Sequence, residues 1–123
     1  MNFDFDDCYW HDSILESVFL DRRELGKNDI IEMVIDWYEE RPKSKIVFKG
    51  VCLFKAVMNS GIHVKETIDT AYIGTVDDPD LINFYKLWKG AYDNVELNCY
   101  VIKTNSTGSE MKILAQSVEE III

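Results

Sequence analysis

Cysteine and histidine, from which many metal and catalytic sites are built, are scarce in this sequence. The three cysteines are widely spaced and form no CxxC pair, so a disulfide framework is not expected. Cys8 and His11 are close enough to chelate a metal together, but a structural zinc site needs about four ligands and His63 is the only other histidine. The acidic groups at 4–7 and 77–80 lack the spacing of a calcium loop. We therefore predict no bound metal and no cofactor.

Motifs for nucleophilic and phosphate chemistry are also missing. The chain has no GxSxG elbow, no glycine-rich phosphate loop and no dinucleotide-binding fingerprint. The absence of these patterns favours a protein that is not an enzyme.

Long apolar runs are a further absence. None approaches the roughly 18 residues that a membrane-spanning helix requires. The first residues, MNFDFDD, are acidic where a secretory signal would be basic and then apolar. We expect a cytoplasmic protein with no membrane partner.

Positive charge is in short supply. Thirteen Lys and Arg residues stand against 22 Asp and Glu residues, which leaves a formal net charge of -9. Such a field repels nucleic acid, whose binding depends on neutralising phosphates, and it attracts a basic protein. We predict a basic protein partner and no nucleic acid, with simple solubility as the alternative reason for the charge.

The 123 residues fit one domain, 1–123, with no linker or internal repeat. Alternating apolar residues predict an antiparallel strand in DIIEMVIDWY, with Ile31, Met33, Ile35 and Trp37 on one face. It should form a hairpin with a strand at 14–21, where Ile14, Val18 and Leu20 share a face. Further strands are expected at 45–51 and in VCLFKAVM, and these two should form a middle pair. Another strand is expected near 68–73.

One helix is predicted, from Pro79 to about Ala91. Asp78 is suited to cap it, Pro79 fits its first position, and an apolar stripe runs from Leu81 to Trp88. The segments VELNCYVIKT and EMKILAQSV flank NSTGS and predict a second hairpin. The expected fold class is α+β, mostly antiparallel sheet built from two hairpins and middle strands, with one covering helix near residues 79–91.

The segment with the most chemistry is Trp10-His11-Asp12-Ser13, just before the first strand. His11 would be a general base if a carboxylate oriented its ring, but neighbours on a strand point to opposite faces, so Asp12 is poorly placed for this. The structural interpretation is that Asp12 or Ser13 hydrogen-bonds local backbone while His11 packs beside Trp10.

Aromatic residues beside acids suggest a recognition surface. Most tryptophans should lie in the core, Trp37 and Trp88 above all, whereas aromatic residues at strand ends next to acids can face a partner. The candidate binding residues are Trp10, His11, Asp12, Tyr38, Glu39 and Glu40, with Tyr9 beside them, and no catalytic residue is assigned.

Three segments carry a resemblance to a family: WHDSILESV at 10–18, DIIEMVIDW at 29–37 and IVFKGV at 46–51. Their order resembles that of a group of small bacterial proteins with an aromatic-His-Asp-Ser corner, some of them proposed as immunity proteins of polymorphic toxin systems. The resemblance covers about the first half of the chain.

The resemblance implies a protein that occludes a basic toxin domain and does no chemistry of its own. This agrees with the charge, so we predict a non-enzymatic binding protein of this type. The alternative is a small hydrolase or metal-dependent enzyme that uses His11 with a carboxylate distant in sequence. Self-association through exposed edge strands, giving a homo-oligomer, is also open.

Overall fold

The structure is a computed structural model that describes residues 3–123. Within them, eight strands and one helix follow one another along the chain. The chain is α+β and mostly antiparallel sheet, as predicted. The elements are β1 (Ile14–Leu20), β2 (Ile30–Asp36), β3 (Ser44–Lys49), β4 (Leu53–Val57), β5 (Ile68–Ile73), α1 (Pro79–Leu87), β6 (Asn98–Thr104), β7 (Glu110–Ala115) and β8 (Ser117–Ile122).

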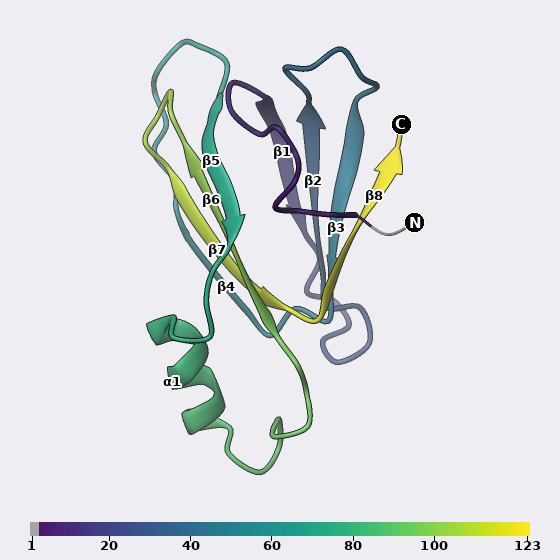
Figure 1. Cartoon of the computed structure of the whole chain (residues 1–123), viewed down its shortest axis with the longest axis vertical. Helices are drawn as coiled ribbons and strands as arrows, with labels where there is room; N and C mark the ends of the chain where they lie inside the picture. Colours follow the sequence, from purple (N-terminus) through teal and green to yellow (C-terminus); the bar gives the residue numbers. More distant parts are fainter. Residues whose placement is uncertain (1–2) are drawn as a thin grey trace.

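The strands form two four-stranded sheets that face each other (Figure 1). The strand order is β1-β2-β3-β8 in one sheet and β4-β7-β6-β5 in the other, and all neighbours are antiparallel. The predicted hairpins are confirmed as β1-β2 and β6-β7. The middle strands β3 and β4 do not pair with each other, because they belong to different sheets.

The chain changes sheets at two adjacent points at the lower end of the sandwich. Gly50 has a φ of +63°, and a Cβ there would lie 2.8 Å from side-chain carbons of Gln116, so glycine allows this close approach. Gln116 in turn donates its backbone N–H to the carbonyl of Lys49 at 3.0 Å. The bend at Gln116 ends β7 and begins β8, a strand that the sequence interpretation had merged into the second hairpin.

Strand β2 follows its predicted pattern, and β1 departs from it. The four alternate residues Ile31, Met33, Ile35 and Trp37 are all buried. In β1 the register shifts between Leu15 and Ser17, so a bulge lies at the intervening glutamate. The bulge places Leu15 rather than Ile14 on the face that Val18 and Leu20 share, opposite the buried Met33 and Ile31 of β2. The predicted shared face is therefore wrong for Ile14 and holds for Val18 and Leu20.

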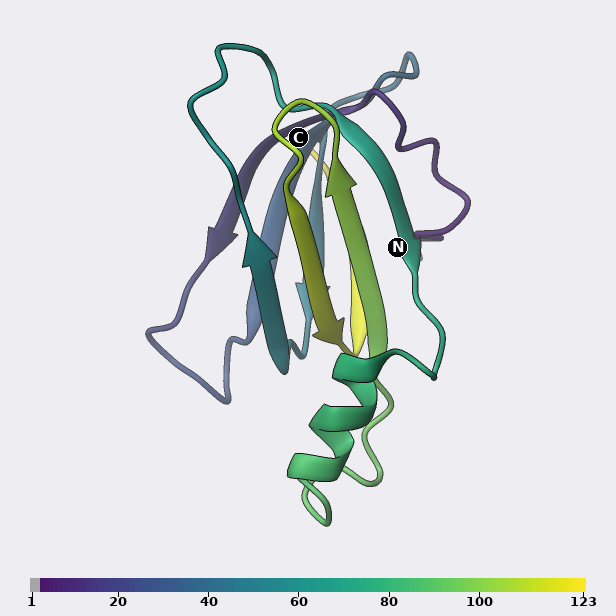
Figure 2. The same ribbon diagram turned by 90° about the vertical axis from the view of Figure 1, so that its left-hand side faces the viewer.

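Helix α1 covers the lower part of the outer face of the β4-β7-β6-β5 sheet (Figures 1 and 2). Asp78 caps it by accepting the N–H groups of Asp80 and Leu81, and Leu81 and Phe84 are buried against the sheet. The helix ends at Leu87, one turn earlier than expected. Trp88 follows its last turn and is 50% exposed, so its predicted place in the core is wrong.

The N-terminal segment, residues 3–13, fills the opening between the two sheets on the side where β5 and β8 are the edge strands (Figures 1 and 2). Phe5 and Trp10 are buried there, with ring centroids 4.7 Å apart. Phe5 also packs against Phe48 of β3 and Tyr100 of β6. The segment therefore joins the cores of both sheets.

No helix in residues 3–123 is both long and apolar enough to span a membrane.

Candidate functional site

The corner at residues 10–13 is a turn that connects the N-terminal segment to β1. Asp12 has a φ of +65°, a left-handed conformation that aspartate tolerates better than most residues. Its backbone N–H donates to the carbonyl of Ile68 at 2.9 Å, and Ile68 donates to the carbonyl of Ser13 at 2.8 Å. These bonds attach the corner to the start of β5 in the opposite sheet.

Ser13 is the structural centre of the corner. It is fully buried, and its hydroxyl donates to the carbonyl of Tyr9 at 3.3 Å while accepting the N–H of Tyr38 at 3.0 Å. Tyr38 follows the end of β2, so this one hydroxyl joins two segments that meet at the upper end of the sandwich. The prediction that Asp12 or Ser13 would bond local backbone is confirmed, with Ser13 as the residue whose side chain does so.

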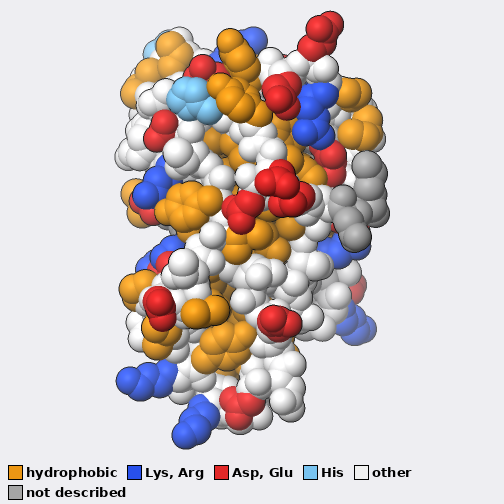
Figure 3. All heavy atoms as spheres, viewed as in Figure 1, with side chains coloured by type: hydrophobic (Ala, Val, Ile, Leu, Met, Phe, Trp, Pro, Cys, Tyr) orange, Lys and Arg blue, Asp and Glu red, His pale blue; other side chains and the backbone are white. Residues whose placement is uncertain are grey.

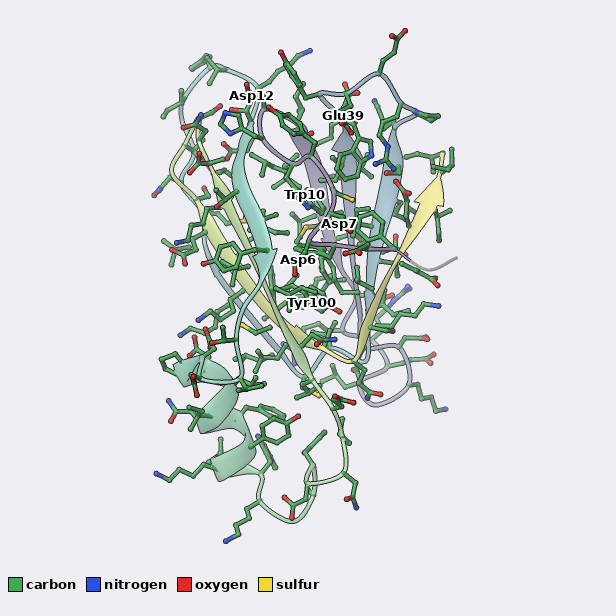
Figure 4. All side chains as sticks on the ribbon, viewed as in Figure 1. Asp6, Asp7, Trp10, Asp12, Glu39 and Tyr100 are labelled. Carbon is green, nitrogen blue, oxygen red and sulfur yellow. The ribbon has the colours of Figure 1, made fainter. Side chains whose placement is uncertain are left out.

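Trp10 is part of the core and cannot contact a partner as the candidate list proposed. Only 4% of it is exposed, and it packs 4.9 Å from Trp37 between ring centroids. Its indole N–H is satisfied by the carbonyl of Phe5 at 2.8 Å. Figure 4 shows it between the two sheets, below Asp12 and Glu39. Its aromatic surface stabilises the fold, so the exposed aromatic groups must come from elsewhere.

His11 lies on the surface rather than packed beside Trp10. Its Nδ1 donates to the carbonyl of Asp69 in β5 at 3.0 Å. The carboxylates of Asp12 and Asp69 lie 3.7 Å from Nε2 and 3.8 Å from Nδ1. The backbone hydrogen bond to Asp69, followed by the charge of Asp12, raises the pKa of His11 above its usual 6.5.

Asp12 lies close to the ring of His11. The prediction that strand geometry would keep these neighbouring side chains apart is therefore wrong. The two residues are in a turn and not in a strand, so their side chains are free to converge. The hydrogen bond of Nδ1 is accepted by the backbone carbonyl of Asp69, and the carboxylate of the same residue lies farther away, at 3.8 Å. Within residues 3–123, no group of three or more potential ligands is arranged to hold a metal ion. The hydrogen bond from His11 to Asp69 tethers the corner to β5.

The remaining candidates, Tyr38, Glu39 and Glu40, are exposed in the loop between β2 and β3. The ring of Tyr38 is 65% exposed and lies 5.9 Å from the ring of Tyr9, which is 45% exposed. Aromatic rings that are rigidly paired yet accessible are typical of protein-binding surfaces, because little side-chain entropy is lost on contact.

Three further acids extend this surface along the N-terminal segment. Asp4, Asp6 and Asp7 are exposed, and Asp6 accepts the N–H of Ile73 at 2.8 Å. A hydrogen bond with Asp4, together with the charges of Asp4 and Asp6, raises the pKa of Asp7. Like charges are thus held together, and a cation brought by a partner would relieve their repulsion.

We call this surface the acidic-aromatic face; in Figure 3 its carboxylates are part of the red group in the middle and upper parts of the view. It consists of Asp4, Asp6, Asp7, Tyr9, Asp12, Tyr38, Glu39 and Glu40.

Several acids elsewhere are neutralised by Lys or Arg. On the outer face of the β1-β2-β3-β8 sheet, three cross-strand ion pairs are Lys43–Glu16, Lys45–Glu32 and Lys49–Glu119. At the N-terminus of α1, Lys112 lies 2.9 Å from Asp78 and 2.7 Å from Asp80. By contrast, among the residues that the structure describes, no Lys or Arg lies within ion-pair distance of a carboxylate of the acidic-aromatic face.

Sequence reasoning missed two parts of this site. Asp4, Asp6 and Asp7 were considered only as metal ligands, although Asp4 and Asp6 alternate with Phe3 and Phe5, a pattern that predicts one buried face. No sequence pattern near Asp69 indicates a role in the site. Asp69 contacts His11 because β5 begins beside the corner.

No protein-family model matches this chain, and no curated protein matches it.

Proposed function

We propose that this chain is a non-enzymatic cytoplasmic protein that binds a basic protein, and that it serves as an immunity protein by covering a basic toxin domain. The observation that carries the proposal is the acidic-aromatic face. Among the described residues its carboxylates have no Lys or Arg partner, and only Asp12 lies beside a histidine, whereas most acids on the neighbouring sheet face are paired with lysine.

The chemistry of the face fits a cationic protein surface. Exposed carboxylates accept charge-assisted hydrogen bonds from Lys and Arg, and they accelerate encounter with a positive partner. Tyr9 and Tyr38 add a pair of exposed aromatic rings to the same face. Nucleic acid and an anionic membrane would both be repelled by the same charges.

The test is affinity capture from the native host with the full chain immobilised, in three parallel forms. The wild type is compared with Asp7→Asn/Glu39→Gln/Glu40→Gln, which removes three charges from the face. The matched control is Glu24→Gln/Glu96→Gln/Glu110→Gln, which removes three exposed charges from other parts of the surface. Both variants change the net charge equally, so only position differs.

We expect a basic protein to be retained by the wild type and the control, with affinity reduced about tenfold or more in the face variant. Retention should weaken as salt rises, because exposed charges are screened. Expression of the captured protein alone should arrest growth, and co-expression with this chain should restore it. Retention of no basic protein, equal loss in both variants, or binding that is insensitive to salt would refute the proposal.

A further inference from the structure

The two sheets have four edge strands, and three of them carry features that hinder pairing with another chain. The register of β1 shifts after Leu15, and that of β5 shifts after Ile68. The backbone of β5 is also engaged by Asp6, which accepts the N–H of Ile73. The edge strand β4 has five residues with Lys55 at its centre. Bulges, short length and lysine are the usual means by which proteins protect sheet edges.

The fourth edge strand, β8, has no bulge and no lysine, and among residues 3–13 only the start of the segment, Phe3 to Phe5, lies beside its first residues, Ser117 and Val118. Its six residues pair with β3 in an unbroken register, and its sequence SVEEII contains no lysine, proline or glycine. It leads directly into Ile123, and the three consecutive isoleucines 121–123 are 45%, 50% and 60% exposed.

The register identifies which backbone groups of β8 point away from the sheet. Ile123 donates its N–H to the carbonyl of Lys43 at 3.2 Å. Because hydrogen-bonded and non-hydrogen-bonded positions alternate in an antiparallel pair, the N–H groups of Ile121 and Glu119 also face β3. Those of Val118, Glu120 and Ile122 face outward, where the described residues provide no backbone partner.

The charges on β8 are already neutralised within the chain. Glu119 lies 2.8 Å from the ammonium of Lys49. Glu120 pairs with Arg41, whose guanidinium lies 4.3 Å from the ring centroid of Trp37. The strand therefore has no unpaired carboxylate to oppose the approach of an identical strand, which is the usual electrostatic safeguard of an acidic edge.

We propose that β8 pairs antiparallel with β8 of a second copy of this chain, so that two four-stranded sheets become one continuous eight-stranded sheet. Such an interface is two-fold symmetric and closed, so it yields dimers rather than filaments. An edge of six residues buries little surface, so the dimer should be weak and its population should depend on concentration. This proposal does not depend on the proposed function.

The experiment is sedimentation velocity of the full chain across a wide range of concentration, with two variants at one position. Ile122→Pro removes an outward N–H and fits an edge position whose N–H makes no ladder bond. Ile122→Ala removes the same apolar side chain but keeps the N–H. We expect the wild type and Ile122→Ala to form dimers at high concentration and Ile122→Pro to remain monomeric.

Amide hydrogen exchange of the wild type provides a second readout that does not need a proline variant. The N–H groups of Val118, Glu120 and Ile122 should gain protection as concentration rises, while Lys55 in β4 should not. Wild-type monomer at every concentration, equal loss in both Ile122 variants, or unchanged protection of β8 would overturn the proposal.

The effect of salt distinguishes dimerisation through β8 from binding of a basic protein. Two copies that each carry a net charge of -9 repel each other, so added salt should strengthen the dimer. The same salt should weaken binding of a basic partner.

Discussion

The two lateral openings of the sandwich differ in what covers them. Between β5 and β8 the chain inserts its own N-terminal segment, and Phe5 and Trp10 become part of the core. Between β1 and β4 no segment of residues 3–123 passes into the core in this way. An open hollow of about 470 Å³ lies there, bordered by the loop after β4 and lined in part by Leu15, Met58 and Ile62. The burial of Phe5 and Trp10 shows that the segment covering the β5–β8 side is part of the core and not only a surface strap.

The largest expected effect tests whether the inserted segment supports the core. Trp10→Ala should lower the free energy of unfolding by about 3–5 kcal/mol, because it leaves a large cavity between the sheets. The matched control is Trp88→Ala after α1, where half of the side chain is already exposed; it should cost no more than about 1 kcal/mol. Urea unfolding measures both. Equal costs would mean that the segment merely lies on the surface.

The next effect concerns the hydrogen bonds that hold the inserted segment in place. Ser13→Ala removes a fully buried hydroxyl that both donates to Tyr9 and accepts from Tyr38. It should cost about 1–3 kcal/mol, since the N–H of Tyr38 loses its partner. Ser60→Ala, in the exposed loop that borders the open side, is the control and should change stability by about 0.5 kcal/mol or less. Comparable losses in the two variants would contradict the central role of Ser13.

The smallest effect is the pH dependence of the tether at His11. Its pKa is raised in the folded state, so the folded chain holds the proton more tightly than the unfolded chain. The stabilisation is fully present below the unfolded value of 6.5 and is lost as pH rises through the higher folded value. The free energy of unfolding should therefore fall slightly as pH rises across neutrality.

His11→Gln should flatten this part of the pH profile, and His63→Gln, in the loop between β4 and β5, should leave it unchanged. Urea unfolding at a series of pH values measures both variants. A profile that keeps its slope in His11→Gln would show that the ring does not stabilise the inserted segment.

Much of the fold could be predicted because its signals are local. Alternation gave the buried face of β2, and Asp78-Pro79 gave the start of α1. The separation of β3 from β4 could not be predicted, because it depends on the contact between Gly50 and Gln116, which are distant in sequence. Strand β8 was missed for the same reason, because it pairs with β3, which is distant in sequence.

The candidate site was predicted in part. The corner was correctly placed at a strand entrance, and Ser13 has the backbone role expected of it. The burial of Trp10 was not foreseen, because it depends on residues 3–10 passing between the sheets and on Trp37 facing them. Composition showed an excess of negative charge, but only the positions of Lys43, Lys45 and Lys49 show which acids are neutralised.

The insertion of residues 3–13 also sets an order for events on the ribosome. Phe5 reaches its final neighbours only after Tyr100 has been synthesised, and β3 gains its second partner only when residues 117–122 emerge. Contacts this distant in sequence slow folding and keep early aromatic residues accessible while translation continues. We therefore expect the nascent chain to complete this fold only after β8 has left the ribosome, with residues 3–13 available to chaperones until then.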